Sequence, residues 1–147
     1  MTKRSLHLID IENLAGTGHL DHVLARRMAA AYHTAAECLV PDLEIVACSH
    51  HSGFAVALAF CGASVRWRSG PDGADLALLE AADELPFECF DRLVIGSGDG
   101  IFVRLARRAS ANGLIVDVVA RACGVSWGLA RAADHLIPIS ELELVAA

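Results

Sequence analysis

Three aspartates stand where apolar runs give way to polar or glycine-rich segments: Asp10, Asp75 and Asp99. Carboxylates that lie close together repel one another, and they are tolerated where a hard divalent cation neutralises them. Magnesium or manganese held in this way activates water and stabilises the charge of a phosphoryl transition state. If the fold brings these side chains together, they predict a metal-assisted site for phosphoryl chemistry.

Each aspartate also has a purely structural interpretation. An aspartate that follows a strand often caps a helix or closes a turn, and this is a strong alternative for Asp75 and Asp99 taken singly. Capping is less expected for Asp10, because its neighbours are apolar and no helix is expected directly after it. Finding all three on one edge of a fold would favour the metal site.

Short apolar runs alternate with longer segments of helical period, which is typical of a parallel α/β sheet buried on both faces. Strands are expected at 6–10, 43–48, 64–67, 92–95, 114–119 and 136–139. Helices are expected at about 20–39, 53–61 and 72–85, then from near Asp99 to Asn112, and after Ser126, with Asp72 and Ser126 as caps. The arginines around the 64–67 strand indicate an edge position.

Right-handed crossovers favour a doubly wound sheet with the strand order 3-2-1-4-5. Strands one and four are then neighbours, and ligands of such sheets bind beyond the carboxyl ends of the strands there. This topology places Asp10, Asp75 and Asp99 at one edge of the sheet.

The composition is that of a folded domain: 54% of the residues are hydrophobic, 20% are charged, and the mean hydropathy is +0.45. These values exclude disorder, and no stretch reaches the roughly 18 apolar residues of a membrane span. The apolar part of the first ten residues is too short for a signal peptide. We expect a single cytoplasmic domain over residues 1–147 that makes no membrane contact.

The charge balance limits the partners of the chain. Twelve basic and 18 acidic residues give a net charge of −6, which argues against broad, non-specific binding of nucleic acid. A local track remains open: Arg104, Arg107 and Arg108 share one helix face, which is either solvated or contacts phosphates. Lys3 is the only lysine, which excludes a P-loop and a Schiff-base enzyme.

Other candidate sites are weaker. The glycines of Gly96-x-Gly98 follow the fourth strand and lack a third glycine, so no nucleotide cofactor is expected. A haloacid dehalogenase-like phosphatase is disfavoured because it needs a lysine within the fold. Cys48, His50 and His51 could bind zinc, but no second cluster completes the site.

The remaining cysteines and the tryptophans are expected to be structural. The five cysteines are odd in number, form no C-x-x-C motif and stand in apolar surroundings, which favours a reducing compartment. Trp67 and Trp127 are expected to pack, although a surface tryptophan could stack on a base.

Four segments resemble, in order, the motifs of the NYN domain family, a branch of the PIN-like nuclease superfamily. They are Asp10-Ile-Glu-Asn13-Leu, Gly73-Ala-Asp75-Leu-Ala-Leu, Ser97-Gly-Asp99-Gly-Ile-Phe102 and Ser126-Trp-Gly-Leu129-Ala-Arg-Ala-Ala-Asp134. The resemblance implies a PIN-like three-layer α/β/α sandwich and a metal-dependent endoribonuclease that uses Mg²⁺ or Mn²⁺. In this interpretation Asp10, Asp75 and Asp99 hold the metal, and Asn13 orients water or substrate.

The chain departs from the family pattern at Ile101, where a second aspartate usually follows the first by two residues. No nearby acid is expected to replace it, and a single metal ion is therefore expected. The alternative function is a weakened or inactive module that binds RNA or protein. We expect RNA as the partner, with Ser97, Arg104, Arg107 and Arg108 contacting it, and a homo-oligomer is compatible with the sequence.

Overall fold

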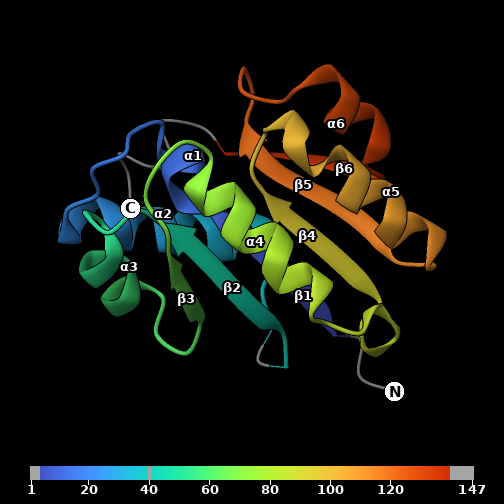
Figure 1. The fold of residues 1–147 in the computed structure, drawn as a ribbon, viewed down its shortest axis with the longest axis horizontal. Helices are drawn as coiled ribbons and strands as arrows, with labels where there is room; N and C mark the ends of the chain where they lie inside the picture. Colours follow the sequence, from blue (N-terminus) through green and yellow to red (C-terminus); the bar gives the residue numbers. More distant parts are fainter. Residues whose placement is uncertain (1–3, 40, 140–147) are drawn as a thin grey trace.

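The computed structural model describes residues 4–39 and 41–139. Within them, six strands form one all-parallel sheet in the order β3-β2-β1-β4-β5-β6 (Figure 1). The strands are β1 (Ser5–Asp10), β2 (Leu43–Cys48), β3 (Ser64–Trp67), β4 (Arg92–Gly96), β5 (Ile115–Arg121) and β6 (His135–Ile139). The predicted order is confirmed, with β3 at one edge and the final strand β6 at the other.

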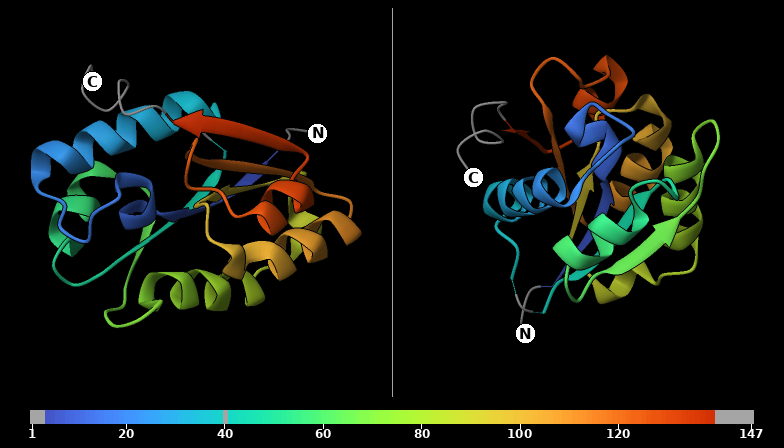
Figure 2. Two further views of the ribbon diagram at one scale, coloured as in Figure 1. Left: turned by 90° about the horizontal axis from the view of Figure 1, so that it is seen from above. Right: turned by 90° about the vertical axis from the view of Figure 1, so that its left-hand side faces the viewer.

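Helices cover both faces of the sheet, so the predicted three-layer sandwich is confirmed (Figure 2). One face carries α1 (Ile11–Ala15), α2 (His22–Ala36) and α3 (Gly53–Ala59). The other carries α4 (Gly73–Asp83), α5 (Val103–Ala111) and α6 (Trp127–Ala132), with short 3₁₀ turns η1 (Phe87–Cys89) and η2 (Gly100–Phe102).

Two apolar cores lie between the sheet and these helix layers. Strand β1 is buried along its whole length, and its side chains alternate between the cores. Leu6 and Leu8 pack with α4 and α5, whereas Ile9 packs with α1 and α2. Burial on both faces explains why the strand sequences read as continuous apolar runs.

Two helix boundaries differ from the prediction. The helix α1 begins directly after Asp10, whose carboxylate Oδ1 accepts the N–H of Asn13 at 3.1 Å, so the expectation that no helix follows Asp10 at once is wrong. This helix is five residues long and ends at Gly16 with φ 72°, too short to show a helical period. The helix α2 is shorter than expected because Asp21 caps its start and Glu37 ends it at φ 51°.

Several side chains expected in apolar surroundings lie in solvent. Cys48 is buried, but Cys61, Cys89 and Cys123 are exposed, because they stand in turns at the ends of helices and strands. The expectation that both tryptophans pack is also wrong: Trp67 is 53% exposed and Trp127 is 74% exposed. Across the described ranges, no helix combines the length and the apolar character that crossing a membrane requires.

Candidate functional site

Acidic side chains from three segments meet at the carboxyl edge of the sheet. Asp10 ends β1, Asp75 lies in the first turn of α4, and Asp99 follows β4. A cleft of about 260 Å³ is lined by Asp10 and Asp75 together with Glu12, Asn13 and Arg68. The parallel topology therefore places the three predicted aspartates on one edge, as expected.

A fourth carboxylate belongs to this cluster. Oxygens of Asp72, Asp75 and Asp99 all lie within 4.8 Å of one another. Asp72 stands at the N-cap position of α4, but its backbone is left-handed at φ 54° and its side chain makes no capping hydrogen bond. The expected capping role is therefore wrong, and Asp72 is an acid beside Asp99 that was predicted only as a helix cap.

The turn that places Asp72 depends on a close backbone approach. A Cβ on Gly73 would lie 2.5 Å from the carbonyl oxygen of Arg68, so only glycine fits there. In the sequence, Gly70-Pro-Asp-Gly73 is a typical turn pattern and is the feature that indicates this turn. The direction of the Asp72 side chain depends on how this turn packs against Arg68, which the sequence does not show.

The two central aspartates are nearly inaccessible to solvent: Asp10 is 6% exposed and Asp75 is 5% exposed. Burial, a hydrogen bond shared with Asp10 and the charges of Asp10, Asp99 and Asp72 raise the pKa of Asp75 to about 8. Burial also raises the pKa of Asp10, although hydrogen bonds from Asp75 and the Asn13 backbone oppose it. Both shifts favour a proton shared by the Asp10–Asp75 pair near neutral pH.

One carboxylate oxygen at this site has no partner. The Oδ1 atom of Asp75 is buried and accepts no hydrogen bond from any residue in 4–39 or 41–139. A buried polar atom without a partner costs about 1–3 kcal/mol. Such an atom among four carboxylates is the geometry expected of a ligand to a hard cation.

The loop that carries Asp99 is held on both sides. The N–H of Gly98 donates to Asn13 Oδ1 at 3.2 Å, and the N–H of Asp99 donates to Ser97 Oγ at 3.2 Å. A Cβ on Gly98 would lie 1.8 Å from the Gly124 carbonyl oxygen, so this position requires glycine. Ser97 is fully buried. In this structure Asn13 and Ser97 support the loop that positions Asp99.

Glu12, two residues after Asp10, is a further residue of the cleft. Its Oε1 accepts the Ser49 N–H at 2.7 Å and the Ser49 hydroxyl at 2.6 Å. These bonds tie the start of α1 to the segment after β2. The arginine of the cleft, Arg68, pairs with Glu80 at 2.8 Å.

The three arginines of the predicted track differ in their contacts. Arg104, Arg107 and Arg108 are all exposed on α5, and Arg104 lies in the turn nearest to Asp99 in the sequence. Arg108 pairs with Asp83 at 2.6 Å and lies 4.9 Å from the centre of the Phe87 ring. Asp83 ends α4, about 12 Å along the helix from Asp75. The structure thus directs Arg108 away from the acidic cluster.

Two other residues of the family motifs supply no carboxylate to the cluster of acids. Asp134 accepts the N–H of Val116 at 2.8 Å, at the amino end of β5 and so at the opposite edge of the sheet. Ile101 is half-buried and packs against the core beneath α4 and α5, while its N–H donates to Asp99 Oδ1 at 3.0 Å.

A mixed cluster of His33, Cys38 and Glu44 lies on the opposite side of the molecule from the acids, near the C-terminal end of α2. Its members bond to one another: His33 Nε2 lies 2.5 Å from Glu44 Oε1. Burial and the nearby Glu44 carboxylate raise the pKa of Cys38 to about 12, so this thiol stays protonated. The cluster is a satisfied hydrogen-bond network.

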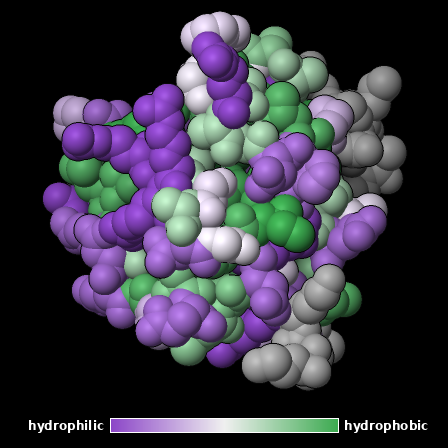
Figure 3. Space-filling model, turned by 90° about the vertical axis from the view of Figure 1, so that its right-hand side faces the viewer, coloured by the Kyte–Doolittle hydropathy of each residue, from purple (hydrophilic) through white to green (hydrophobic). Residues whose placement is uncertain are grey.

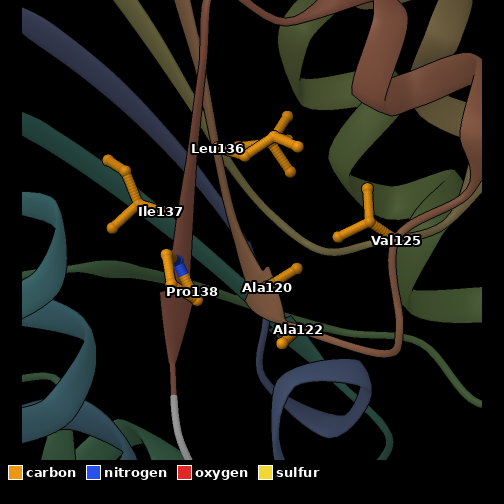
Figure 4. A pocket seen from close by; sticks show the side chains of 7 residues that line it. Ala120, Ala122, Val125, Leu136, Ile137 and Pro138 are labelled. Atoms are coloured by element: carbon orange, nitrogen blue, oxygen red, sulfur yellow. The ribbon is translucent and has the colours of Figure 1, made fainter.

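A second hollow is apolar. About 300 Å³ in volume, it lies between β5, β6 and the start of α6 and is lined by Val118, Ala120, Ala122, Val125, Leu136, Ile137 and Pro138. Figure 4 shows Val125 and Leu136 reaching toward each other across it. Seen from this side, apolar surface gathers near the middle of the face among hydrophilic residues (Figure 3). The lining offers no acid, base or metal ligand.

Comparisons with known proteins identify the family and support the fold. The profile of the NYN domain matches residues 7–141. A protein of unknown function from Vibrio parahaemolyticus, known from a crystal structure, superposes with a TM-score of 0.68 at 18% identity, covering 95% of this chain and 94% of that one. At this identity the likeness shows the fold alone. A comparison with curated proteins found no match. On the strength of the profile match over nearly its whole length, the chain belongs to the NYN domain family of the PIN-like nuclease superfamily.

Proposed function

We propose that the protein is a metal-dependent endoribonuclease whose acidic cluster holds Mg²⁺ or Mn²⁺. The observation that carries this proposal is the buried, unpartnered Oδ1 of Asp75 within a group of four carboxylates. The donor set consists of carboxylate oxygens, which suits hard cations and not zinc or copper. The residues present therefore fit the ion that the family implies.

Asp10, Asp75 and Asp99 would hold the ion, and Asp72 supplies a fourth carboxylate at the solvent side of the cluster. When bound, the ion supplies charge stabilisation at the phosphate and lowers the pKa of water. Asn13 and Ser97 fix the Gly98–Asp99 backbone, so Asp99 keeps its place without reorganisation. In this proposal Asp72 supplies the negative charge that the family's second aspartate, replaced here by Ile101, would supply.

The proton shared by Asp10 and Asp75 sets the charge of the site when no metal is bound. At neutral pH the pair carries one negative charge less than two free aspartates, which limits repulsion among the four groups. A cation that binds here displaces this proton, because both carboxylates are then stable in their charged form. Cation affinity is therefore expected to increase with pH up to about pH 8.

RNA is the proposed substrate, and its contacts must be local because the net charge is −6. Arg104 and Arg107 are the exposed members of the α5 track that form no ion pair within 4–39 and 41–139. Each arginine that neutralises a phosphate contributes about one unit to the slope of binding affinity against salt. Replacing Arg104 and Arg107 by alanine should reduce that slope by up to about two units, and Arg108→Ala should change it less.

Cleavage of a labelled RNA with Mn²⁺ or Mg²⁺ tests the function. The parent should cleave, and Asp10→Asn and Asp75→Asn should lose cleavage while remaining folded. Asp91→Asn is the matched control, because Asp91 is exposed at the amino edge and, among the described residues, its carboxylate accepts only the Arg4 N–H. RNA binding without cleavage in either metal would instead support the non-catalytic alternative.

A further inference from the structure

A large exposed aromatic side chain lies beside the loop that carries Asp99. Trp127 is the first residue of α6 and is 74% exposed. The preceding residue, Ser126, donates its N–H to the carbonyl oxygen of Gly98 at 2.8 Å. This contact limits the separation of the Trp127 and Asp99 Cα atoms to about 15 Å. The indole is therefore within a few nucleotides' reach of the acidic cluster.

An arginine covers part of this indole. Arg131, one helical turn along α6, places its guanidinium carbon 4.6 Å from the centre of the Trp127 ring. Within the described ranges, no carboxylate lies within 4.0 Å of its guanidinium nitrogens. The stacked cation restrains the ring and keeps its positive charge available to an anion.

A second arginine extends the positive charge along the same edge. Arg121 is the last residue of β5, at the carboxyl end of the sheet. Its guanidinium lies against Gly16 at the end of α1, where a Cβ would come within 2.6 Å of Nη1. None of the ion pairs formed by the described residues includes it.

The other tryptophan, Trp67, packs part of its ring against a helix, although half of the side chain is exposed. Trp67, at the end of β3, lies against Gly53, where a Cβ would come within 2.9 Å of the ring. Glycine at position 53 thus leaves room for the Trp67 ring to contact α3. The Trp127 ring instead stacks with the guanidinium of Arg131, and Trp127 is the more exposed of the two tryptophans.

We propose that Trp127, Arg131 and Arg121 form a binding surface for single-stranded RNA, with a nucleobase stacked on Trp127 and the arginines on flanking phosphates. The inference rests on the proposed ribonuclease function and adds the residues that contact the strand beside the acidic cluster. A duplex keeps its bases stacked and paired, so only an unpaired base can occupy the indole face. Stacking of this kind tolerates any base, so the surface selects single strands without selecting sequence.

Binding of a short oligouridine in chelator tests the surface without any contribution from metal or cleavage. Trp127→Ala should weaken binding about 5- to 100-fold, and Trp127→Phe should retain part of it. Trp67→Phe is the matched control and should bind as the parent does. Arg131→Ala and Arg121→Ala should each reduce the salt slope by about one unit.

Fluorescence gives a second readout that needs no change at Trp127. The chain has two tryptophans, so in the Trp67→Phe variant the emission comes from Trp127 alone. Oligouridine should quench this emission, and an RNA duplex of equal length should not. Unchanged binding by Trp127→Ala, or no quenching in Trp67→Phe, would overturn the proposal.

The outcomes also separate this proposal from the proposed function. If Asp75→Asn abolishes cleavage while Trp127→Ala binds normally, the surface is wrong and the nuclease stands. If the parent never cleaves but Trp127→Ala loses oligouridine binding, the surface stands and the protein is an RNA-binding module.

Discussion

The two ends of the parallel sheet treat their charges in opposite ways. At the amino end, each buried acid has a partner: Asp42 bonds to His7 at 3.1 Å, and Asp117 bonds to Arg92 at 2.7 Å. At the carboxyl end, four aspartates face one another and Asp75 Oδ1 has no partner among the described residues. The amino end thus stabilises the fold, whereas the carboxyl end fits the proposed cation site.

The pKa shifts follow the same division. Burial alone would raise the pKa of Asp42, but the backbone N–H groups of Leu39 and Ser5 and the His7 ring outweigh it and lower the pKa. His33 lowers the pKa of Glu44 in the same way against burial. Burial and neighbouring carboxylates instead raise the pKa of Asp75 to about 8.

Breaking an amino-end ion pair should have the largest effect on stability. Asp117 holds both Arg92 and His135, each at 2.7 Å. Asp117→Asn leaves the half-buried guanidinium of Arg92 without its counter-charge, which should cost about 3 kcal/mol of unfolding free energy. Urea denaturation in chelator measures this. Asp75→Asn should cost nothing or stabilise, and an equal loss in both variants would contradict the comparison.

Metal should stabilise the carboxyl end alone. At a Mn²⁺ concentration of 100 times Kd, the parent should gain about 2.7 kcal/mol of unfolding free energy. Asp99→Asn should lose this gain yet keep or raise its melting temperature in chelator, because asparagine can still accept the Ile101 N–H. Thermal melts with and without Mn²⁺ measure both. A gain in the variant equal to that of the parent would place the metal elsewhere.

Adding a fifth carboxylate sharpens the contrast further. Ile101 packs against the core, so Ile101→Asp should cost about 2 kcal/mol in chelator. Mn²⁺ should recover part of this loss if the new carboxylate reaches the cluster, and cleavage should then increase. Ile101→Asn is the matched control and should show the loss without the recovery. Equal responses of both variants to Mn²⁺ would show that Ile101 does not limit the site.

The last expected effect is in the pH dependence of stability without metal. The pKa of Asp75 is higher in the folded chain than in the unfolded one, so folding binds a proton between about pH 4 and pH 8. Its contribution is therefore favourable at low pH and is lost as the pH rises through about 8. The lowered pKa of Asp42 acts in the opposite sense, and its contribution is lost as the pH falls below about 4.

Denaturation of the parent and two variants across this range separates the contributions. Asp75→Asn should flatten the decline toward pH 8, and Asp42→Asn should reduce the loss in acid. If Asp75→Asn declines toward pH 8 as steeply as the parent, the shared proton of the Asp10–Asp75 pair is not present.

The sequence predicted what depends on chain direction and apolar pattern. Buried runs marked the strands, and the carboxyl ends of parallel strands brought Asp10, Asp75 and Asp99 to one edge. What it missed depends on tertiary contacts. The side chain of Asp72 is directed by a turn packed on Arg68, and Trp127 is exposed because the short helix α6 buries Leu129 instead.

Calorimetric titration of Mn²⁺ at pH 7, in two buffers of different ionisation enthalpy, tests the proposed cation site most directly. Mn²⁺ should bind the parent with release of the proton shared by Asp10 and Asp75, whereas Asp75→Asn should bind weakly and release none. Asp91→Asn should match the parent. Equal Mn²⁺ binding by the parent and Asp75→Asn, or binding without proton release, would contradict the assignment of the carboxyl end as a cation site.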